Sequence, residues 1–390
     1  MERAIECFEM ALRLMGRYVP RRWPILLLLL IWEVILQVLH GALPACFVHR
    51  VRRQPADHER LVLKLFSHLA HGCWYCRDKV HVMWAHLRGM NLAERYQPSA
   101  ELAQAYAEHA PGLTLLGFLR RAEAYAKKSL EIRRQLGDLW GQGQSLHYWG
   151  VVLYAGSRFH RCIEMCRDGI RLLERTGDYW QVHIARYQIA ASLYRLGNAD
   201  AALQEAQLNY RSGIELRDEQ ASAIILDIWA RATRGVVPDD VIEREVQRPR
   251  RDAQGRAQVL FAKALCLARK GELDESTETL QQAIDEVDSS GIHNAYTLPY
   301  RPWLATILRW KARQLGHHTP IRREQLLRRA ESVARRAVRA RWLCRNDLPH
   351  ALRELALILA MRGRVRPTRR LLQRSLRLAN RKEARWEYAQ

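Results

Sequence analysis

The chain has 390 residues, a formal net charge of +22 and an apolar content of 48%. This apolar content excludes a disordered chain, and the length exceeds what one ordinary core organises, so several domains or a repeat array are expected. Gly and Pro are sparse, at 21 and 13, and this composition favours helices. No alternating run rich in Val and Thr is bounded by turn residues, so strands are not expected.

Residues 2–17 form the first predicted helix. It fits the second helix of the repeat described below, with Ala4 in a small-residue position and Leu12 in a large apolar position. At the other end, the sequence EARWEYAQ carries no helix stop signal. We therefore expect both termini to cut through a longer helical array.

The stretch RRWPILLLLLIWEVILQVLHG, residues 21–41, contains an apolar helix over 25–39. At 1.5 Å per residue this helix is about 22 Å long, whereas a membrane crossing needs about 20 residues. Glu33, Gln37 and His40 fall on one face, as in an amphipathic packed helix. An internal buried helix is favoured. The alternatives are a signal or lipoprotein leader, a membrane span, and a helix docked on a membrane surface through residues 23–48.

A group of His and Cys residues in one predicted helical region is the best metal candidate. Zinc accepts both residue types, and two of the cysteines have CxxC spacing. Cysteines three apart on a helix also arise from packing, and no second ligand pair stands at a suitable loop. Buried thiols with surface histidines are therefore favoured, and no metal or cofactor is expected. The group consists of His68, His71, Cys73, Cys76, His81 and His86.

A repeat organises the chain from about residue 99 onward. Gly137-Asp138 recurs forty residues later as Gly177-Asp178, and Trp140 recurs as Trp180. We take one turn residue as position zero of each unit: Gly117, Ser157, Gly197, Gly271 and Gly363. Seven residues earlier stands Ala or Gly, at Ala110, Gly150, Ala190, Ala264 and Ala356. Five residues later stands a small residue, at Ala122, Cys162, Ala202, Ser276 and Thr368.

This pattern predicts a helical hairpin in which small residues let two antiparallel helices approach closely. Large apolar residues thirteen positions after the turn, at Leu130, Ile170, Tyr210, Ile284 and Leu376, are expected to face neighbouring hairpins. A single hairpin cannot bury its apolar face alone, so hairpins stack into a solenoid. The long intervals 197–271 and 271–363 predict one degenerate unit each, near Gly235 and Gly316.

The small residues on both helices and the Gly at the turn resemble the tetratricopeptide repeat (TPR). The resemblance implies an all-α fold, a right-handed superhelical solenoid of antiparallel helix hairpins. The strongest units repeat every 40 residues, where the family has about 34, and the proline usual after the second helix is missing. We predict degenerate repeats over 1–98, well-formed repeats over 99–235, and degenerate repeats with a basic C-terminal part over 236–390.

A looser resemblance concerns the context of the repeats. The runs HLRGMNLAERY (86–96), GQGQSLHYWGVVLYAGSRF (141–159) and ARWEYAQ look similar to helical-repeat tails of large bacterial signalling proteins. In those proteins a serine/threonine kinase, ATPase or cyclase module precedes the repeats. The resemblance implies a regulatory portion in which the catalytic domain lies outside this chain.

The basic character is concentrated in the last quarter of the sequence. Residues 301–390 contain 24 Lys and Arg against six Asp and Glu. Six arginines of a predicted helix form one candidate partner-binding face: Arg322, Arg329, Arg336, Arg328, Arg335 and Arg339. Such a face suits an acidic protein segment, anionic lipid or nucleic acid. A solvated face is the simpler interpretation, and nucleic acid is the weakest, because no recognised nucleic-acid motif accompanies the charge.

The aromatic residues of two adjacent units form a second group. They are Trp140, Tyr148, Trp149, Tyr154, Tyr179, Trp180 and Tyr187. Most are expected in the core between repeats, and a subset is a candidate lining of an inner, peptide-binding surface.

The sequence lacks the phosphate-binding loop, nucleophile-elbow, kinase and HExxH motifs, so an enzyme is not expected. The eight cysteines are too few for a disulfide scaffold and predict reduced, buried thiols in a cytosolic protein. Together these features predict a cytoplasmic, non-catalytic scaffold that binds a protein or peptide segment. The alternative is a regulator associated with nucleic acid or an anionic membrane through its basic C-terminal helices.

Overall fold

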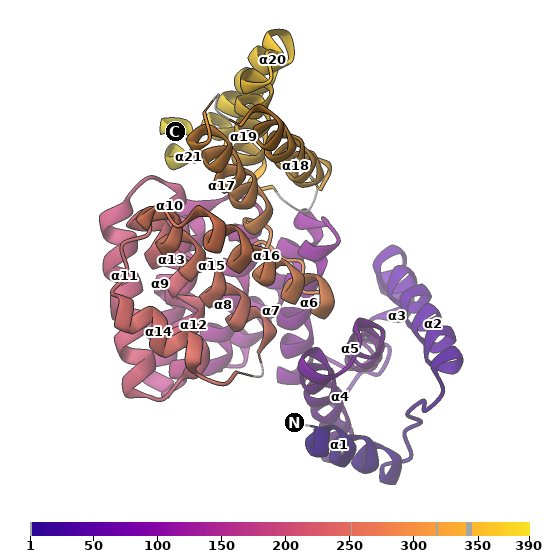
Figure 1. The fold of residues 1–390 in the computed structure, drawn as a ribbon. Coiled ribbons are helices and arrows are strands. Elements are labelled where there is room, and N and C mark those ends of the chain that lie inside the picture. The colour runs from indigo at the N-terminus through magenta and orange to yellow at the C-terminus, as the bar shows by residue number, and fades with distance from the viewer. Residues whose placement is uncertain (1, 251, 317–318, 341–344) are drawn as a thin grey trace. The chain divides into compact units, whose positions relative to one another are not determined.

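The structure is a computed structural model that describes residues 2–250, 252–316, 319–340 and 345–390, without the side chains of residues 75 and 76. The described residues form helices and connecting turns and contain no strand, as the composition predicts (Figure 1). The N-terminal helices are α1 (Glu2–Leu14), α2 (Trp23–Ala42), α3 (Pro44–Phe47), α4 (Asp57–Cys76) and α5 (Lys79–Ala93).

The remaining helices form consecutive antiparallel hairpins. The first helices of the hairpins are α6 (Ala100–Leu115), α8 (Leu139–Ala155), α10 (Tyr179–Arg195), α12 (Glu219–Ile224) with α13 (Leu226–Ala232), α15 (Ala253–Lys270), α17 (Tyr300–Gln314) and α19 (Leu348–Met361). The second helices are α7 (Leu119–Gln135), α9 (Phe159–Thr176), α11 (Ala199–Glu215), α14 (Asp239–Gln247), α16 (Leu273–Ser290), α18 (Pro320–Arg339) and α20 (Val365–Arg381). A short helix, α21 (Arg385–Ala389), follows.

The turn of every hairpin contains a residue with left-handed backbone geometry. The five turn residues of the predicted repeat all have positive φ, and so do Gly235 and Gly316, where the degenerate units were predicted. Glycine adopts this conformation without the steric cost that a Cβ imposes. The prediction of helical hairpins is therefore confirmed, and so is the hidden unit at Gly316, where α17 packs on α18; at Gly235 the turn is present, but α14 packs on α15.

The small residues bring the paired helices together as predicted. The Ser276 hydroxyl donates a 2.7 Å hydrogen bond to the carbonyl of Ala264, and Thr368 donates one of 3.2 Å to the carbonyl of Ala356. Both pairs join the position five residues after the turn to the position seven residues before it. A side chain larger than Ala, Ser, Thr or Cys there would push the helices apart. These hairpins show that the described residues from 100 onward are TPR-like.

The hairpin around Gly235 departs most from the pattern. Its first helix is interrupted at Ile225 between α12 and α13, and its second helix, α14, has 9 residues, whereas α16 has 18. The later hairpins have full-length helices, including the one that turns at Gly316, whose sequence matches the repeat poorly. A unit whose sequence departs from the repeat can therefore still form a regular helical hairpin.

The chain divides into two compact units. Unit 1 contains residues 1–112 and 120–149, and unit 2 contains residues 113–119 and 150–390. In unit 1, α4 and α5 form an antiparallel pair, with α1 packed on α4 and α2 packed on α5. The domain boundaries predicted at residues 98 and 235 stay predictions.

Helix α2 is longer than the predicted 25–39 segment, and its polar side is the buried one. Its polar residues Glu33, Gln37 and His40 are buried, whereas most of its apolar residues face outward. Only 28% of its most apolar 18-residue window is buried, and its length and composition would suffice for a membrane span. The expectation of an internal buried helix is therefore wrong. The polar side faces the interior because α5 and the residue that follows it supply charged and amide partners for Glu33 and His40.

The cysteines are also less uniformly buried than expected. Cys73, Cys162, Cys166 and Cys266 are buried, but the thiols of Cys7 and Cys46 are exposed. Cys7 lies on the outer side of α1, and Cys46 lies in the short α3 that follows α2. The cysteines at positions 76 and 344 lie outside the described side chains.

Candidate functional site

The predicted basic face lies on α18, and all six of its arginines are exposed. Helix α18 is the second helix of the hairpin that turns at Gly316. Its apolar side, which includes Leu327 and Ala330, is buried, so the arginines occupy the opposite, solvent-facing side. The structure thus places the six residues on one helix, as the sequence predicts; whether they bind a partner stays a prediction.

Two of the six arginines are engaged by acidic residues of their own helix. Arg328 pairs with Glu324 at 2.9 Å, and Arg335 pairs with Glu331 at 2.6 Å. Arg362, at the end of α19, contacts both glutamates as well. Hydrogen bonds from Arg328 and Arg362 lower the pKa of Glu324. These glutamates therefore hold α18 against the following turn and neutralise part of the basic face.

The other four arginines form no ion pair within the described residues, although Arg322 adds to the effect of the Lys311 hydrogen bond in lowering the pKa of Asp274. Among the residues that the structure describes, no carboxylate lies within 4 Å of Arg322, Arg329, Arg336 or Arg339. Arg329 makes one long contact of 3.4 Å with the amide oxygen of Gln281 on α16. A guanidinium without an internal partner remains free to form paired hydrogen bonds with an external carboxylate.

Helix α20 is a second arginine-rich helix that the sequence prediction did not single out. It contains no Asp or Glu and buries only Ser375 and Ala379. The exposed arginines of α20 are Arg366, Arg369, Arg370, Arg374, Arg377 and Arg381. The signal in the sequence is the absence of acidic residues over 365–381.

The inner surface formed by the first helices of unit 2 is occupied by the chain itself. The ring of Tyr296, from the segment between α16 and α17, stacks on Tyr154 of α8 at 5.3 Å. It also meets Tyr187 of α10 edge-on at 5.3 Å, and its hydroxyl donates to the amide oxygen of Gln188 at 2.9 Å. Tyr154 and Tyr187 are therefore covered, and the alternative that they line an open peptide-binding surface is not supported.

The last hairpin closes over the earlier ones at a second place in unit 2. Asn346 donates to the carbonyl of Tyr154 at 2.9 Å, and the ring of Trp386 packs on Tyr194 at 4.8 Å. Arg195 forms buried ion pairs with Asp347 and Glu387. In an open solenoid each repeat contacts only its neighbours. Here α10 also contacts α21, so unit 2 closes on itself (Figure 1).

The metal candidate does not assemble among the described residues. No group of three or more His, Cys, Asp or Glu residues there is arranged to hold a metal. The predicted continuous helix is interrupted between α4 and α5, where Asp78 caps α5 and contacts His81 at 2.8 Å. His86 instead contacts His109 of α6 at 3.0 Å. The side chain of the second cysteine of the CxxC pair lies outside the described residues.

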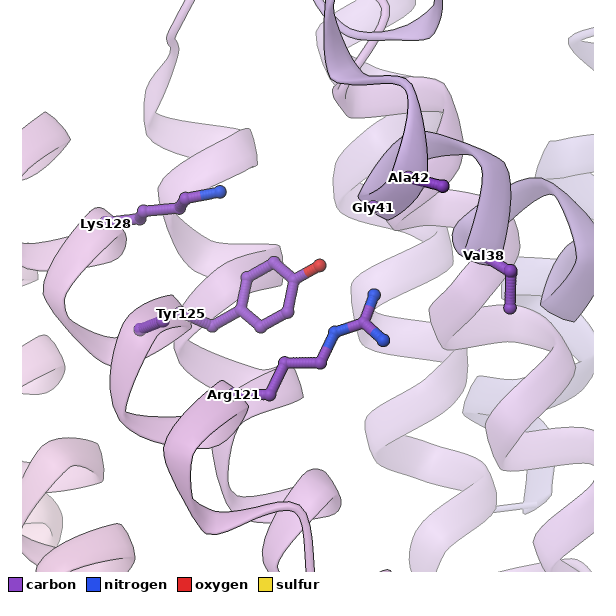
Figure 2. Close-up of a pocket in the computed structure, with 7 residues that line it drawn as sticks. Val38, Gly41, Ala42, Arg121, Tyr125 and Lys128 are labelled. Carbon is purple, nitrogen blue, oxygen red and sulfur yellow. The ribbon is translucent and has the colours of Figure 1, made fainter.

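A cavity of about 380 Å³ lies in unit 1, between α2 and α7. Figure 2 shows the side chains of Arg121, Tyr125 and Lys128 pointing from α7 toward Val38 and Gly41 near the end of α2. The Tyr125 hydroxyl accepts a 3.1 Å hydrogen bond from Gln37. The cavity therefore combines an apolar wall with two cationic side chains.

No family model and no curated protein matches this chain. A Rap protein in complex with the Competence and Sporulation Factor is 13% identical, covers 95% of this chain and 99% of its own, and has a TM-score of 0.49. The apo form of RapI is 11% identical over 82% of this chain and 98% of its own, with a TM-score of 0.42.

The human IFIT1 dimer with m7Gppp-AAAA is 15% identical over 96% of this chain and 72% of its own, with a TM-score of 0.47. At these identities and TM-scores, the ligands of these proteins carry no information about this chain. The hairpins and their turns by themselves identify it as an all-α chain of TPR-like helical repeats.

Proposed function

We propose that this chain is a non-catalytic scaffold whose arginine-rich helices α18 and α20 bind an acidic segment of a partner protein. The observation that carries the proposal is the composition and exposure of α20. Its 17 residues contain six exposed arginines and no acidic residue. Concentrated positive charge on one helix attracts an oppositely charged partner and accelerates its association.

The surface of α20 also offers apolar contacts. Val365 and Leu376 are exposed on the same helix as the arginines. An acidic amphipathic helix can pair its carboxylates with the guanidinium groups and place its apolar residues on these side chains. The phosphates of a nucleic-acid backbone would contact the arginines but not the apolar side chains. The mixture of charge and apolar surface therefore favours a protein segment.

The closed inner surface of unit 2 supports the same assignment. Tyr296 and the last hairpin cover the tyrosines of α8 and α10 that an extended peptide would contact in an open array. A partner that binds without displacing these residues has to use an outer surface. The second helices α18 and α20 present such a surface, with their buried sides turned toward α17 and α19.

The wider context of the proposal is a cytoplasmic bacterial signalling protein in which these repeats regulate a catalytic domain. The support is the resemblance of residues 86–96 and 141–159 to repeat tails of such proteins, together with the absence of catalytic motifs. The regulatory role predicts that the purified chain changes the activity of a catalytic domain encoded with it. An unchanged activity at saturating chain would argue against this role.

Fluorescence anisotropy with the full chain tests the binding proposal. The probe is a labelled amphipathic peptide rich in Glu and Leu, and a Lys-substituted version of the same peptide controls for apolar binding. We expect the acidic peptide alone to bind, with an affinity that falls as salt rises. Substituting Arg370→Glu, Arg374→Glu and Arg377→Glu together should weaken binding at least about tenfold.

A matched variant separates a specific surface from general basicity. Arg171→Glu, Arg211→Glu and Arg217→Glu reverse three exposed arginines of unit 2 outside α18 and α20. These reversals change the net charge equally and should leave binding nearly unchanged. Equal losses in the two triple variants would refute a defined site. Tighter binding of DNA or RNA of similar charge would transfer the assignment to the nucleic-acid alternative.

A further inference from the structure

Helix α2 of unit 1 presents an apolar face to solvent along its whole length. Leu28 and Ile35 are 67% and 46% exposed, and Trp23, Trp32 and Val38 are exposed as well. At 1.5 Å per residue, the 20 residues of α2 extend for about 30 Å. A continuous apolar stripe of this kind on a folded unit marks a surface that binds something apolar.

Buried polar contacts prevent α2 from rotating its apolar face inward. Glu33 is only 1% exposed; it contacts the Arg88 guanidinium at 3.0 Å and the Asn91 amide at 2.8 Å. One turn beyond Gln37, the ring of His40 contacts Glu94 at 2.5 Å. Rotation would break these contacts and deprive the buried Asn91 of α5 and the buried Glu94 that follows it of these partners, at considerable cost. The outward orientation of the apolar face is therefore imposed by the packing of unit 1.

The cationic cavity lies at the C-terminal end of this apolar face. Val38 belongs to both the apolar face and the cavity wall, and a Cβ on Gly41 would come within 2.6 Å of the Arg121 guanidinium. The Lys128 ammonium lies 5.3 Å from the centre of the Tyr125 ring. Among the described residues, no carboxylate lies within 4 Å of Arg121 or Lys128. Figure 2 shows both cationic side chains reaching toward α2.

We propose that α2 docks unit 1 on an anionic phospholipid bilayer, with its apolar face among the acyl chains and a lipid phosphate in the Arg121–Lys128 cavity. Exposed tryptophans at positions 23 and 32 have the amphipathic rings that favour a membrane interface. Arg21 and Arg22, both exposed, precede α2 and add positive charge at its other end. An apolar stripe between cationic groups matches the layered chemistry of an anionic membrane surface.

The packing of α2 favours docking in the interface over crossing the bilayer. A crossing would carry Glu33 into the hydrocarbon region together with its partners Arg88 and Asn91 on α5. Helix α5 packs against α4, whose solvent side carries Asp57, Arg60 and Lys64. Moving so many charged side chains into the hydrocarbon region would cost much free energy. The helix therefore binds by one face, and unit 1 stays in water.

Vesicle flotation with the full chain tests the proposal. We expect the chain to float with phosphatidylcholine vesicles containing phosphatidylglycerol, and to float less with pure phosphatidylcholine. Ile35→Asp should abolish flotation with both lipids. Arg121→Gln and Lys128→Gln should each weaken binding to the anionic vesicles about fivefold. Quenching of tryptophan fluorescence by brominated lipid should fall in Trp32→Phe while flotation persists, which reports insertion of α2 directly.

Matched controls separate this site from the basic C-terminal helices. Leu61→Asp changes a residue of α4 in the same unit that is 48% exposed, and Arg120→Gln removes the charge next to Arg121 on the first turn of α7. Both should leave flotation unchanged, as should the triple reversal on α20 that tests peptide binding. The membrane and peptide proposals therefore fail independently.

Three outcomes would overturn the proposal. The first is flotation that survives Ile35→Asp but is lost with the charge reversals on α20, which would assign membrane binding to the C-terminal helices. The second is a lipid-independent dimer that Ile35→Asp dissociates, seen by analytical ultracentrifugation; it would assign the face to a second copy of the chain. The third is an absence of flotation by a chain whose circular dichroism shows it to be folded.

Discussion

Arg195 and Asp347 are separated by 152 positions in the sequence and form a buried ion pair in unit 2. Their side chains are 1% and 2% exposed. Glu387 joins the pair through a 3.3 Å contact with Arg195 and a 3.0 Å contact with Arg353. The pair ties the end of α10 to the start of α19 and to α21. It is one of the contacts through which the solenoid of unit 2 closes, together with that of Trp386 on Tyr194.

Replacing Arg195 by Met should strongly destabilise unit 2. The substitution leaves Asp347 and Glu387 buried with less compensation, which costs about 3–5 kcal/mol when one partner of a buried pair is removed. Urea unfolding measures the loss, and hydrogen exchange should become faster in α19 and α21. Arg171→Met is the control, because its pair with Asp168 is exposed and contributes about 1 kcal/mol or less. Equal losses would show that the closing contact adds nothing.

Replacing Tyr296 by Ala should open the covered inner surface of unit 2. The substitution removes the packing on Tyr154 and Tyr187 and the hydrogen bond to Gln188, and aromatic truncations in a core cost about 3–5 kcal/mol. Tyr296→Phe keeps the packing and should cost about 1 kcal/mol, the contribution of the hydrogen bond. Thermal unfolding measures both. An exposed aromatic on α10 provides the comparison: Tyr179→Ala should change stability by about 0.5 kcal/mol or less.

Replacing Gly150 by Ala tests the close approach of helices within a hairpin. A Cβ at this position would lie 2.3 Å from the sulfur of Cys166 on α9. We expect a loss of about 1–3 kcal/mol from overpacking, despite the better helix propensity of Ala. Cys166→Ala removes the obstructing sulfur, so the double variant should recover most of the loss. Additive losses in the double-mutant cycle would contradict this geometry.

The pair His86 and His109 should make unit 1 sensitive to acid. Burial lowers the pKa of His86 from 6.5 to about 4, and burial also lowers the pKa of His109. Both rings are therefore neutral in the folded protein at pH values where the unfolded chain binds protons. Their contribution to stability is complete above pH 6.5 and decreases as the pH falls toward 4, because protons then favour the unfolded state.

The decrease is at most about 1.4 kcal/mol per pH unit for each histidine. Urea unfolding at several pH values measures this slope. His86→Asn should reduce the slope between pH 6.5 and 4. His58→Asn, which changes an exposed histidine of α4, should leave it unchanged. A slope that is the same in wild type and His86→Asn would show that His86 is not buried in neutral form.

The sequence was sufficient to predict the hairpins, because their signals are local. A small residue at Ala264 and another at Ser276 meet across a tight turn, and the turn residue Gly271 needs left-handed geometry. These requirements act within about 20 residues and recur from unit to unit. Even the hidden turns at Gly235 and Gly316 follow from the spacing between the clear units.

The candidate sites were predicted less completely. The arginines of α18 were found through their periodicity, and their pairs Glu324–Arg328 and Glu331–Arg335 are local contacts four residues apart on one helix. The sequence could not show that Arg362, from the end of α19, contacts both glutamates as well. The cavity residues Arg121 and Lys128 gave no signal. They line a cavity only because α2, which is some 80 positions earlier in the sequence, lies beside them.

By itself, the sequence determined that the chain is helical, that its helices pair into hairpins and where the hairpins turn. Only the tertiary structure decided which side of α2 is buried, and that unit 2 closes on itself. Both depend on polar residues distant in sequence, such as Glu33 with Asn91 and Arg195 with Asp347. Apolar periodicity shows that a helix has two faces. Which face turns inward depends on whether its polar groups find partners, and those partners come from other helices.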